Sequence, residues 1–147
     1  MLRYVIAIAL LAAVIGCRST GDEAAIRQAI DEIAESISRK DSGDIVSYLS
    51  PEFLDKDGRD RRAIRQFMIV QFLRNKDIAV FITRVEIRVS GQTAIAQLQV
   101  GLTGMSGLIP ERGEYYLANL DWRKEKNKWL LHRLDWEPVL FKHDQTG

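Results

Sequence analysis

The hydrophobic pattern of this chain changes its period at the polar residues 75–77. Before them, apolar residues recur every three or four positions, which is the spacing of one face of a helix. After them, apolar and polar residues alternate, as they do along a half-buried strand. Helices followed by an antiparallel meander predict an α+β fold, with the helices packed on one face of a curved sheet.

Three amphipathic helices are predicted before the change of period. Thr20 and Glu23 have the spacing of a capping box, so the first helix should begin there and end near residues 41–43. Asp44 is predicted to cap a short second helix over residues 45–49, and Pro51 should prevent its continuation. The predicted buried positions of the first helix are Ile26, Ile30, Ile33 and Ile37. The third helix should begin at Asp60 and bury Ile64, Phe67, Met68, Gln71 and Phe72, with Ile69 and Leu73 widening that stripe.

Four strands are predicted after the change of period, each with one apolar face. Their predicted inner residues are, in chain order, Phe81, Thr83, Val85, Ile87 and Val89; Ala94, Ala96, Leu98, Val100 and Leu102; Tyr116, Ala118, Leu120 and Trp122; and Leu130, His132, Leu134 and Trp136.

The last two strands carry a recognisable hairpin. Residues 121–131, Asp-Trp-Arg-Lys-Glu-Lys-Asn-Lys-Trp-Leu-Leu, place a charged turn before a strand that contains Trp. With this hairpin and this order of elements, residues 23–138 resemble the nuclear transport factor 2-like (NTF2-like) superfamily, which includes SnoaL-type cyclases and ketosteroid isomerase. The resemblance implies a cone, in which a curved sheet wraps around the first helices and leaves a pocket at its open end. Enzymes of the superfamily place carboxylates, Tyr or His in that pocket.

Alternation along the last two strands places their even-numbered residues inside the cone. His132 is then the ionisable group on the inner face of the last strand, although Trp129 and Leu131 on the other face indicate that a bulge could reverse this. His132 could serve as a general base or orient a ligand, or it could be a core histidine bonded to a backbone carbonyl or a tyrosine. The residues predicted to line the pocket are Tyr48, Phe53, Phe67, Tyr116, His132 and Trp136.

Catalytic chemistry has weak support in the sequence. His132 and Asp55 are weak catalytic candidates, and Asp55 belongs to Asp-Lys-Asp-Gly, which also suits an ordinary turn. No serine lies in a nucleophile-elbow context, and two histidines without a free cysteine predict no metal site; no cofactor is predicted. We therefore expect a non-catalytic domain that binds a small apolar ligand or a protein partner. The alternatives are an isomerase or cyclase acting on a small hydrophobic substrate, and a self-associating structural protein of the envelope.

Two surface features leave alternatives open. Arg59, Arg61, Arg62 and Arg65 surround the start of the third helix, where they could hold an anion or simply pair with nearby acids. The glycine-rich segment 104–113 carries Met105, Leu108 and Ile109. These residues could cover the pocket mouth, contact another protein, or tuck under the edge of the sheet.

The N-terminal residues have the form of an export signal. Arg3 precedes an apolar stretch over residues 4–15, which is shorter than the roughly 20 residues that span a bilayer. Val14-Ile15-Gly16-Cys17 resembles the bacterial lipobox, which implies cleavage before Cys17, a thioether-linked lipid on it and acylation, for example with palmitate, of the new N-terminus. The predicted division is a signal peptide (1–16), a lipidated tether (17–22), the NTF2-like domain (23–138) and a tail (139–147). An uncleaved helix with an incidental cysteine is the alternative.

The charge and the cysteine content of the chain are consistent with an exported lipoprotein. Cys17 is the chain's single cysteine, so it has no partner for an internal disulfide, and lipidation would explain it. Arg18 follows it, and the resemblance then implies an outer-membrane protein facing the periplasm, provided that the host has two membranes. Lys and Arg number 21 against 20 Asp and Glu, so removal of Arg3 with the leader leaves a neutral domain. A neutral domain lacks the basic surface that nucleic acid requires, and nucleic acid is not an expected partner.

Overall fold

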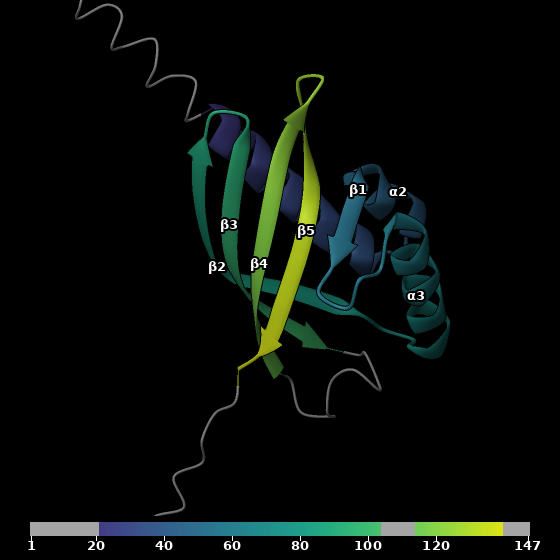
Figure 1. The fold of residues 1–147 in the computed structure, drawn as a ribbon. Helices are drawn as coiled ribbons and strands as arrows, with labels where there is room; N and C mark the ends of the chain where they lie inside the picture. The colour runs from purple at the N-terminus through teal and green to yellow at the C-terminus, as the bar shows by residue number, and fades with distance from the viewer. Residues whose placement is uncertain (1–20, 104–113, 140–147) are drawn as a thin grey trace, which may run out of the picture.

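The computed structural model describes residues 21–103 and 114–139. A helix covers residues 21–38. It is followed by α2 (Ser42–Ser47), β1 (Leu49–Asp55), α3 (Arg61–Arg74), β2 (Ala79–Ser90), β3 (Thr93–Thr103), β4 (Glu114–Glu125) and β5 (Lys128–Pro138) (Figure 1). The strands form one sheet in the order β1-β5-β4-β3-β2, in which β1 runs parallel to β5 and the other neighbours are antiparallel. The predicted α+β fold is confirmed.

The helix over residues 21–38, called the N-terminal helix below, buries the predicted stripe. Ile26 and Ile30 are buried, and Ile33 and Ile37 are partly buried. The helix ends because Lys40 adopts a left-handed backbone conformation with φ 60°, and the amide of Asp41 bonds back to the carbonyl of Ser36 at 2.9 Å.

The second helix begins earlier than predicted. Its N-cap is Asp41, whose carboxylate accepts the backbone N–H of Asp44 at 2.9 Å. The prediction that Asp44 caps a helix over residues 45–49 is wrong by three residues, because the chain leaves Lys40 directly into the next helical turn. The carboxylate of Asp44 instead accepts a hydrogen bond from the buried hydroxyl of Ser36, which joins α2 to the N-terminal helix.

Strand β1 is missing from the sequence-based prediction. Its residues do not alternate simply between buried and exposed, and it contains Pro51, which cannot donate to a strand ladder. The structure accommodates Pro51 because β1 is an edge strand, and its register with β5 shifts between Leu49 and Leu54. Leu49, Phe53 and Asp55 of this strand are buried.

Helix α3 begins as predicted and buries a narrower stripe. Asp60 is its N-cap and accepts the backbone N–H of Ala63 at 2.8 Å. Ile64 and Gln71 are buried, whereas Ile69 and Leu73 are 39% and 83% exposed. The prediction that these last two residues widen the stripe is therefore wrong; they lie on the solvent side of the helix.

The predicted inner faces of β3 and β4 are confirmed, whereas a bulge alters β2. Its register with β3 shifts between Ile82 and Arg84, so one residue of β2 has no opposite neighbour there. Val85, Ile87 and Val89 pack against the core as predicted, but before the bulge it is Ile82 that does so. Phe81 is 56% exposed and Thr83 is also exposed, so their predicted inward orientation is wrong.

A second bulge alters β5. The register with β4 passes from Asp121 opposite Arg133 to Trp122 opposite Leu131, which leaves His132 as the extra residue. Trp129 and Leu131 are consequently buried in the core, while Leu130 and His132 are only partly buried. The predicted inward face holds for Leu134 and Trp136 and is wrong before the bulge, where the odd-numbered residues face inward.

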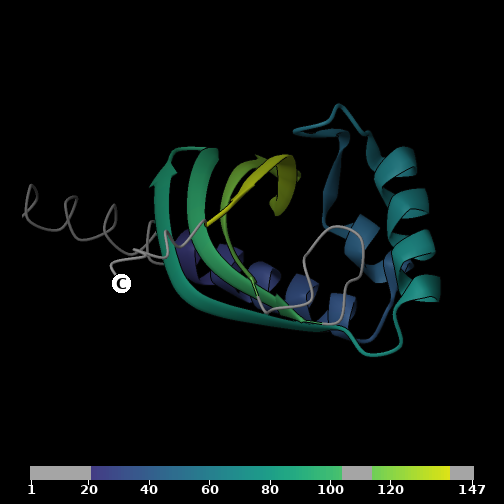
Figure 2. The same cartoon turned by 90° about the horizontal axis from the view of Figure 1, so that it is seen from below.

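The core lies between the concave face of the sheet and the N-terminal helix. Trp122, Phe53 and Ile26 are its most deeply buried large side chains, with at most 1% of each exposed. Seen from below, β2 and β3 bend around the N-terminal helix (Figure 2). Helix α3 stands at the right of this view, opposite the turn between β2 and β3. Among the described residues, the core cluster and the residues packed on it extend from Ile26 to Trp136. Within residues 21–103 and 114–139, we find no helix whose length and apolar content would suit a membrane span.

Candidate functional site

The helices and the concave face of the sheet line a partly open cavity of about 260 Å³. Both helices and strands line it, and the side chains that they contribute are aliphatic or aromatic except for the thioether of Met68. The helices contribute Ile30, Ile33, Ala34, Ile37, Ile45, Ile64, Phe67, Met68 and Phe72, and the strands contribute Leu49, Phe53, Val80, Ile82, Leu98, Val100, Leu102, Tyr116, Ala118, Leu120, Leu131, Leu134 and Trp136.

The chemistry of this lining is uniform. Among the described residues, no charged side chain borders the cavity, and the phenol of Tyr116 is its one hydroxyl. An apolar cavity offers water few partners, and even an engineered cavity of about 150 Å³ stays dry and binds benzene or xenon. The cavity of this protein, at about 260 Å³, lies just below the roughly 300–1,000 Å³ of common ligand pockets. The cavity is therefore suited to a small hydrocarbon group.

The cavity contains four of the six residues predicted to line a pocket. Phe53, Phe67, Tyr116 and Trp136 line it, from β1, α3, β4 and β5 respectively. Tyr48 and His132 do not border it. Their separation from the cavity has two different causes.

Tyr48 points toward the surface of the N-terminal helix. Its hydroxyl donates a hydrogen bond to the carboxylate of Glu32, and the ammonium of Lys128 lies 5.6 Å from the centroid of its ring. The bond to Glu32 raises the pKa of Tyr48 to about 12 and lowers the pKa of Glu32. Through this hydrogen bond Tyr48 joins the C-terminal end of α2 to the N-terminal helix.

His132 leaves the cavity wall because it is the extra residue of the β5 bulge. Its Nδ1 atom is buried and has no hydrogen-bond partner among the described residues. The predicted partners of a core histidine, a backbone carbonyl or a tyrosine, are thus not found at Nδ1.

Asp55 is buried, and its carboxylate organises the loop between β1 and α3. One oxygen accepts the backbone N–H groups of Asp57 and Arg59, at 3.0 and 2.7 Å, and the other accepts the guanidinium of Arg59 at 2.8 Å. The same guanidinium reaches Asp57 at 2.7 Å, and its pKa is raised, chiefly by the bond to Asp55. This engagement supports the turn interpretation of Asp55, and the predicted pairing with nearby acids holds for Arg59.

Two cations contact aromatic residues of the cavity wall, and the sequence-based prediction did not include these contacts. The guanidinium carbon of Arg59 lies 4.4 Å from the ring centroid of Phe67, and the ammonium of Lys56 lies 4.9 Å from that of Trp136. Both rings line the cavity. The sequence places Lys56 in a polar turn and Arg59 at the start of the third helix, and only the fold reveals which aromatic residues they contact.

Other predicted features lie outside the cavity or outside the described residues. Cys17, the leader and the segment 104–113 belong to the part of the chain that the structure does not describe. Within the described part, no group of three His, Cys, Asp or Glu side chains is placed to hold a metal ion. The outer face of the sheet exposes Phe81, Ile95, Tyr115 and Leu117, the apolar surface on which the predicted self-association would depend.

Comparison with known proteins establishes the fold. No protein-family model matches the chain, and no curated protein is a significant match. A candidate dehydratase of the NTF2-like family from Streptomyces avermitilis has a similar structure, with a TM-score of 0.72 at 19% identity over 83% of this chain and 99% of that one. An NTF2-like protein from Pseudomonas putida also gives 0.72, at 15% identity over 88% and 94%. A candidate aromatic ring hydroxylase from Novosphingobium aromaticivorans gives 0.67, at 15% identity over 83% and 92%. The chain therefore has an NTF2-like fold, and at these identities the likeness extends to fold alone.

Proposed function

We propose that this NTF2-like domain is a lipid-anchored, non-catalytic module of the cell envelope that binds a small apolar ligand in its cavity. The observation that carries the ligand proposal is the uninterrupted aliphatic and aromatic lining of a space of about 260 Å³. Burial of apolar surface supplies roughly 25 cal/mol per Å², so such a lining favours a hydrocarbon group over water.

A binding role fits the lining better than catalysis does. Acid–base chemistry needs an ionisable group within hydrogen-bond reach of the substrate. Neither of the two catalytic candidates meets that condition for a molecule inside the cavity. The carboxylate of Asp55 is occupied by Arg59 and two backbone amides, and His132 does not border the cavity.

A cavity-filling substitution tests ligand binding. Ala34 of the N-terminal helix lines the cavity, whereas Ala25 of the same helix is exposed. In the Ala34→Phe variant the added ring should occupy the space and weaken binding of the neutral dye N-phenyl-1-naphthylamine by at least about tenfold, which is 1.4 kcal/mol. Dye fluorescence measures the affinity, and circular dichroism checks folding.

The Ala25→Phe variant is the matched control, and we expect it to bind the dye as the wild type does. If wild type and the Ala34→Phe variant bound the dye equally well, the dye would be bound elsewhere, and the cavity would lose its proposed role.

The proposal of a lipid anchor is based on the lipobox-like sequence Val14-Ile15-Gly16-Cys17. Processing there would leave residues 17–20 ahead of the described part of the N-terminal helix, so the domain would lie close to the membrane. With Arg18 after the cysteine, the proposed location is the periplasmic face of the outer membrane in a host with two membranes. More than one acyl chain is needed for stable anchoring, at about 0.8 kcal/mol for each buried methylene.

A Cys17→Ser variant should lose this anchor. Expressed in a bacterial host, the wild type should be found in the membrane fraction and incorporate labelled palmitate, whereas the variant should incorporate none. Immunoblots of cell fractions and palmitate autoradiography give the two readouts. Palmitate incorporation by the variant equal to that of the wild type would contradict lipidation at Cys17.

A further inference from the structure

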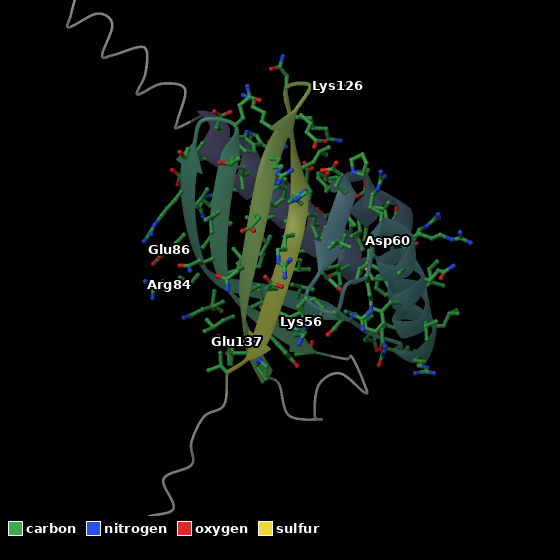
Figure 3. All side chains as sticks on the ribbon, viewed as in Figure 1. Lys56, Asp60, Arg84, Glu86, Lys126 and Glu137 are labelled. Atoms are coloured by element: carbon green, nitrogen blue, oxygen red, sulfur yellow. The ribbon has the colours of Figure 1, made fainter. Side chains whose placement is uncertain are left out.

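A positive charge lies beside an aromatic residue of the cavity wall. The ammonium of Lys56 lies 4.9 Å from the centroid of the Trp136 ring, and Trp136 borders the cavity. Lys56 is exposed, so its charged end stays in water beside the apolar space. Figure 3 shows Lys56 beside β5, in the part of the molecule that also contains the C-terminal end of that strand.

Lys56 differs from its neighbour Arg59 in having no acidic partner. Arg59 is bound by Asp55 and Asp57, at 2.8 and 2.7 Å. Within residues 21–103 and 114–139, no carboxylate lies within ion-pair distance of the Lys56 ammonium, although Asp57 is close by in the sequence. The charge of Lys56 is therefore available to an anion held at this edge.

We infer that the ligand is an aliphatic carboxylate, with its hydrocarbon tail in the cavity and its carboxylate at Lys56. This inference rests on the proposed function, since it requires that the cavity bind an apolar group. An ionised carboxylate would be strongly disfavoured among the aliphatic side chains, so it has to stay at the edge. Beside the cavity wall, Lys56 supplies an exposed cation that has no ion-pair partner among the described residues.

A comparison of two ligands of equal chain length distinguishes the contribution of the tail to the affinity from that of the charge. Octanoate and octan-1-ol share the hydrocarbon tail, and only octanoate is charged at pH 8. Isothermal titration calorimetry of residues 17–147, with Cys17→Ser to prevent lipidation, should show octanoate binding about two- to fivefold more tightly, as an exposed charge pair allows. This preference should shrink when NaCl is raised from about 20 to about 500 mM, because salt screens exposed charges.

The Lys56→Gln variant should bind both ligands equally, with the affinity for octan-1-ol unchanged from wild type. The matched control is Lys126→Gln: Lys126 lies at the tip of the β4–β5 hairpin, away from Lys56 (Figure 3). This control should keep the preference for octanoate.

The outcomes distinguish the two proposals. If neither ligand binds the wild type, the proposed function fails. If both ligands bind the wild type equally, or if Lys56→Gln keeps the preference, the cavity still binds apolar ligands and the role of Lys56 is wrong. If Lys56→Gln does not fold, the salt dependence of the wild-type preference decides: a preference that does not change with salt overturns the inference.

Discussion

Replacement of Asp55 by alanine should lower the free energy of unfolding by about 3 kcal/mol, because it removes the buried partner of the Arg59 guanidinium and leaves two backbone donors without an acceptor. The Asp55 side chain is fully buried, and the Arg59 side chain that it binds is 27% exposed. The carboxylate also holds the backbone N–H groups of Asp57 and Arg59. Its removal should therefore loosen the connection between β1 and α3. Urea denaturation followed by circular dichroism measures the change.

Asp57 provides the matched control, since it binds the same guanidinium from an exposed position. Its side chain is 47% exposed, so the Asp57→Ala variant should lose no more than about 1 kcal/mol. An Asp55→Asn variant keeps an acceptor for the backbone amides and should fall between the two. Stability of the Asp55→Ala variant within about 0.5 kcal/mol of wild type, the usual range for surface substitutions, would contradict the structural role.

Replacement of Trp122 by alanine should cost about 3–5 kcal/mol, the usual range for a large aromatic residue in a core. Trp122 is 1% exposed and belongs to the core on the inner face of β4. Its indole Nε1 has no hydrogen-bond partner among the described residues. Phenylalanine would remove that unpaired donor while it keeps an aromatic ring, so the Trp122→Phe variant should lose much less, about 1 kcal/mol. Thermal and urea denaturation give both values.

Ile95 lies on the neighbouring strand β3 and serves as the control for this pair. It is 52% exposed, so the Ile95→Ala variant should stay within about 0.5 kcal/mol of the wild type. If the Trp122→Phe and Trp122→Ala variants were equally destabilised, the indole N–H would be making an interaction that phenylalanine cannot replace.

The fold was predictable along the parts of the sheet that have no bulge, where each residue lies opposite one residue of the neighbouring strand. Alternation correctly placed Ala94, Ala96 and Leu98 of β3, and Ala118 and Leu120 of β4, in the core. It failed at both bulges, because one extra residue reverses the faces. Phe81 and His132 were misplaced for this reason. In β5 the apolar residues Trp129 and Leu131 indicated that a bulge was possible, whereas no such sign was found in β2. β1 was missed because an edge strand with Pro51 and an irregular register has no simple period.

Four aromatic residues of the cavity lining were predictable from the sequence, whereas the contact of Lys56 with the cavity wall was not. Phe53, Phe67, Tyr116 and Trp136 line it as predicted. Tyr48 was misassigned because its hydroxyl binds Glu32, a partner sixteen positions away that only the tertiary fold brings close to the C-terminal end of α2. The contact of Lys56 with Trp136 likewise joins residues far apart in the chain, so no local pattern could reveal it.

Native mass spectrometry of residues 17–147 carrying Cys17→Ser, exported to a bacterial periplasm and purified without detergent, tests most directly whether the cavity carries an apolar ligand. We expect a species heavier than the polypeptide by the mass of one small molecule, with the extra mass lost on denaturation. If the purified domain instead had the bare polypeptide mass and gained none when octan-1-ol or octanoate was added, the proposal of a ligand-binding cavity would be wrong.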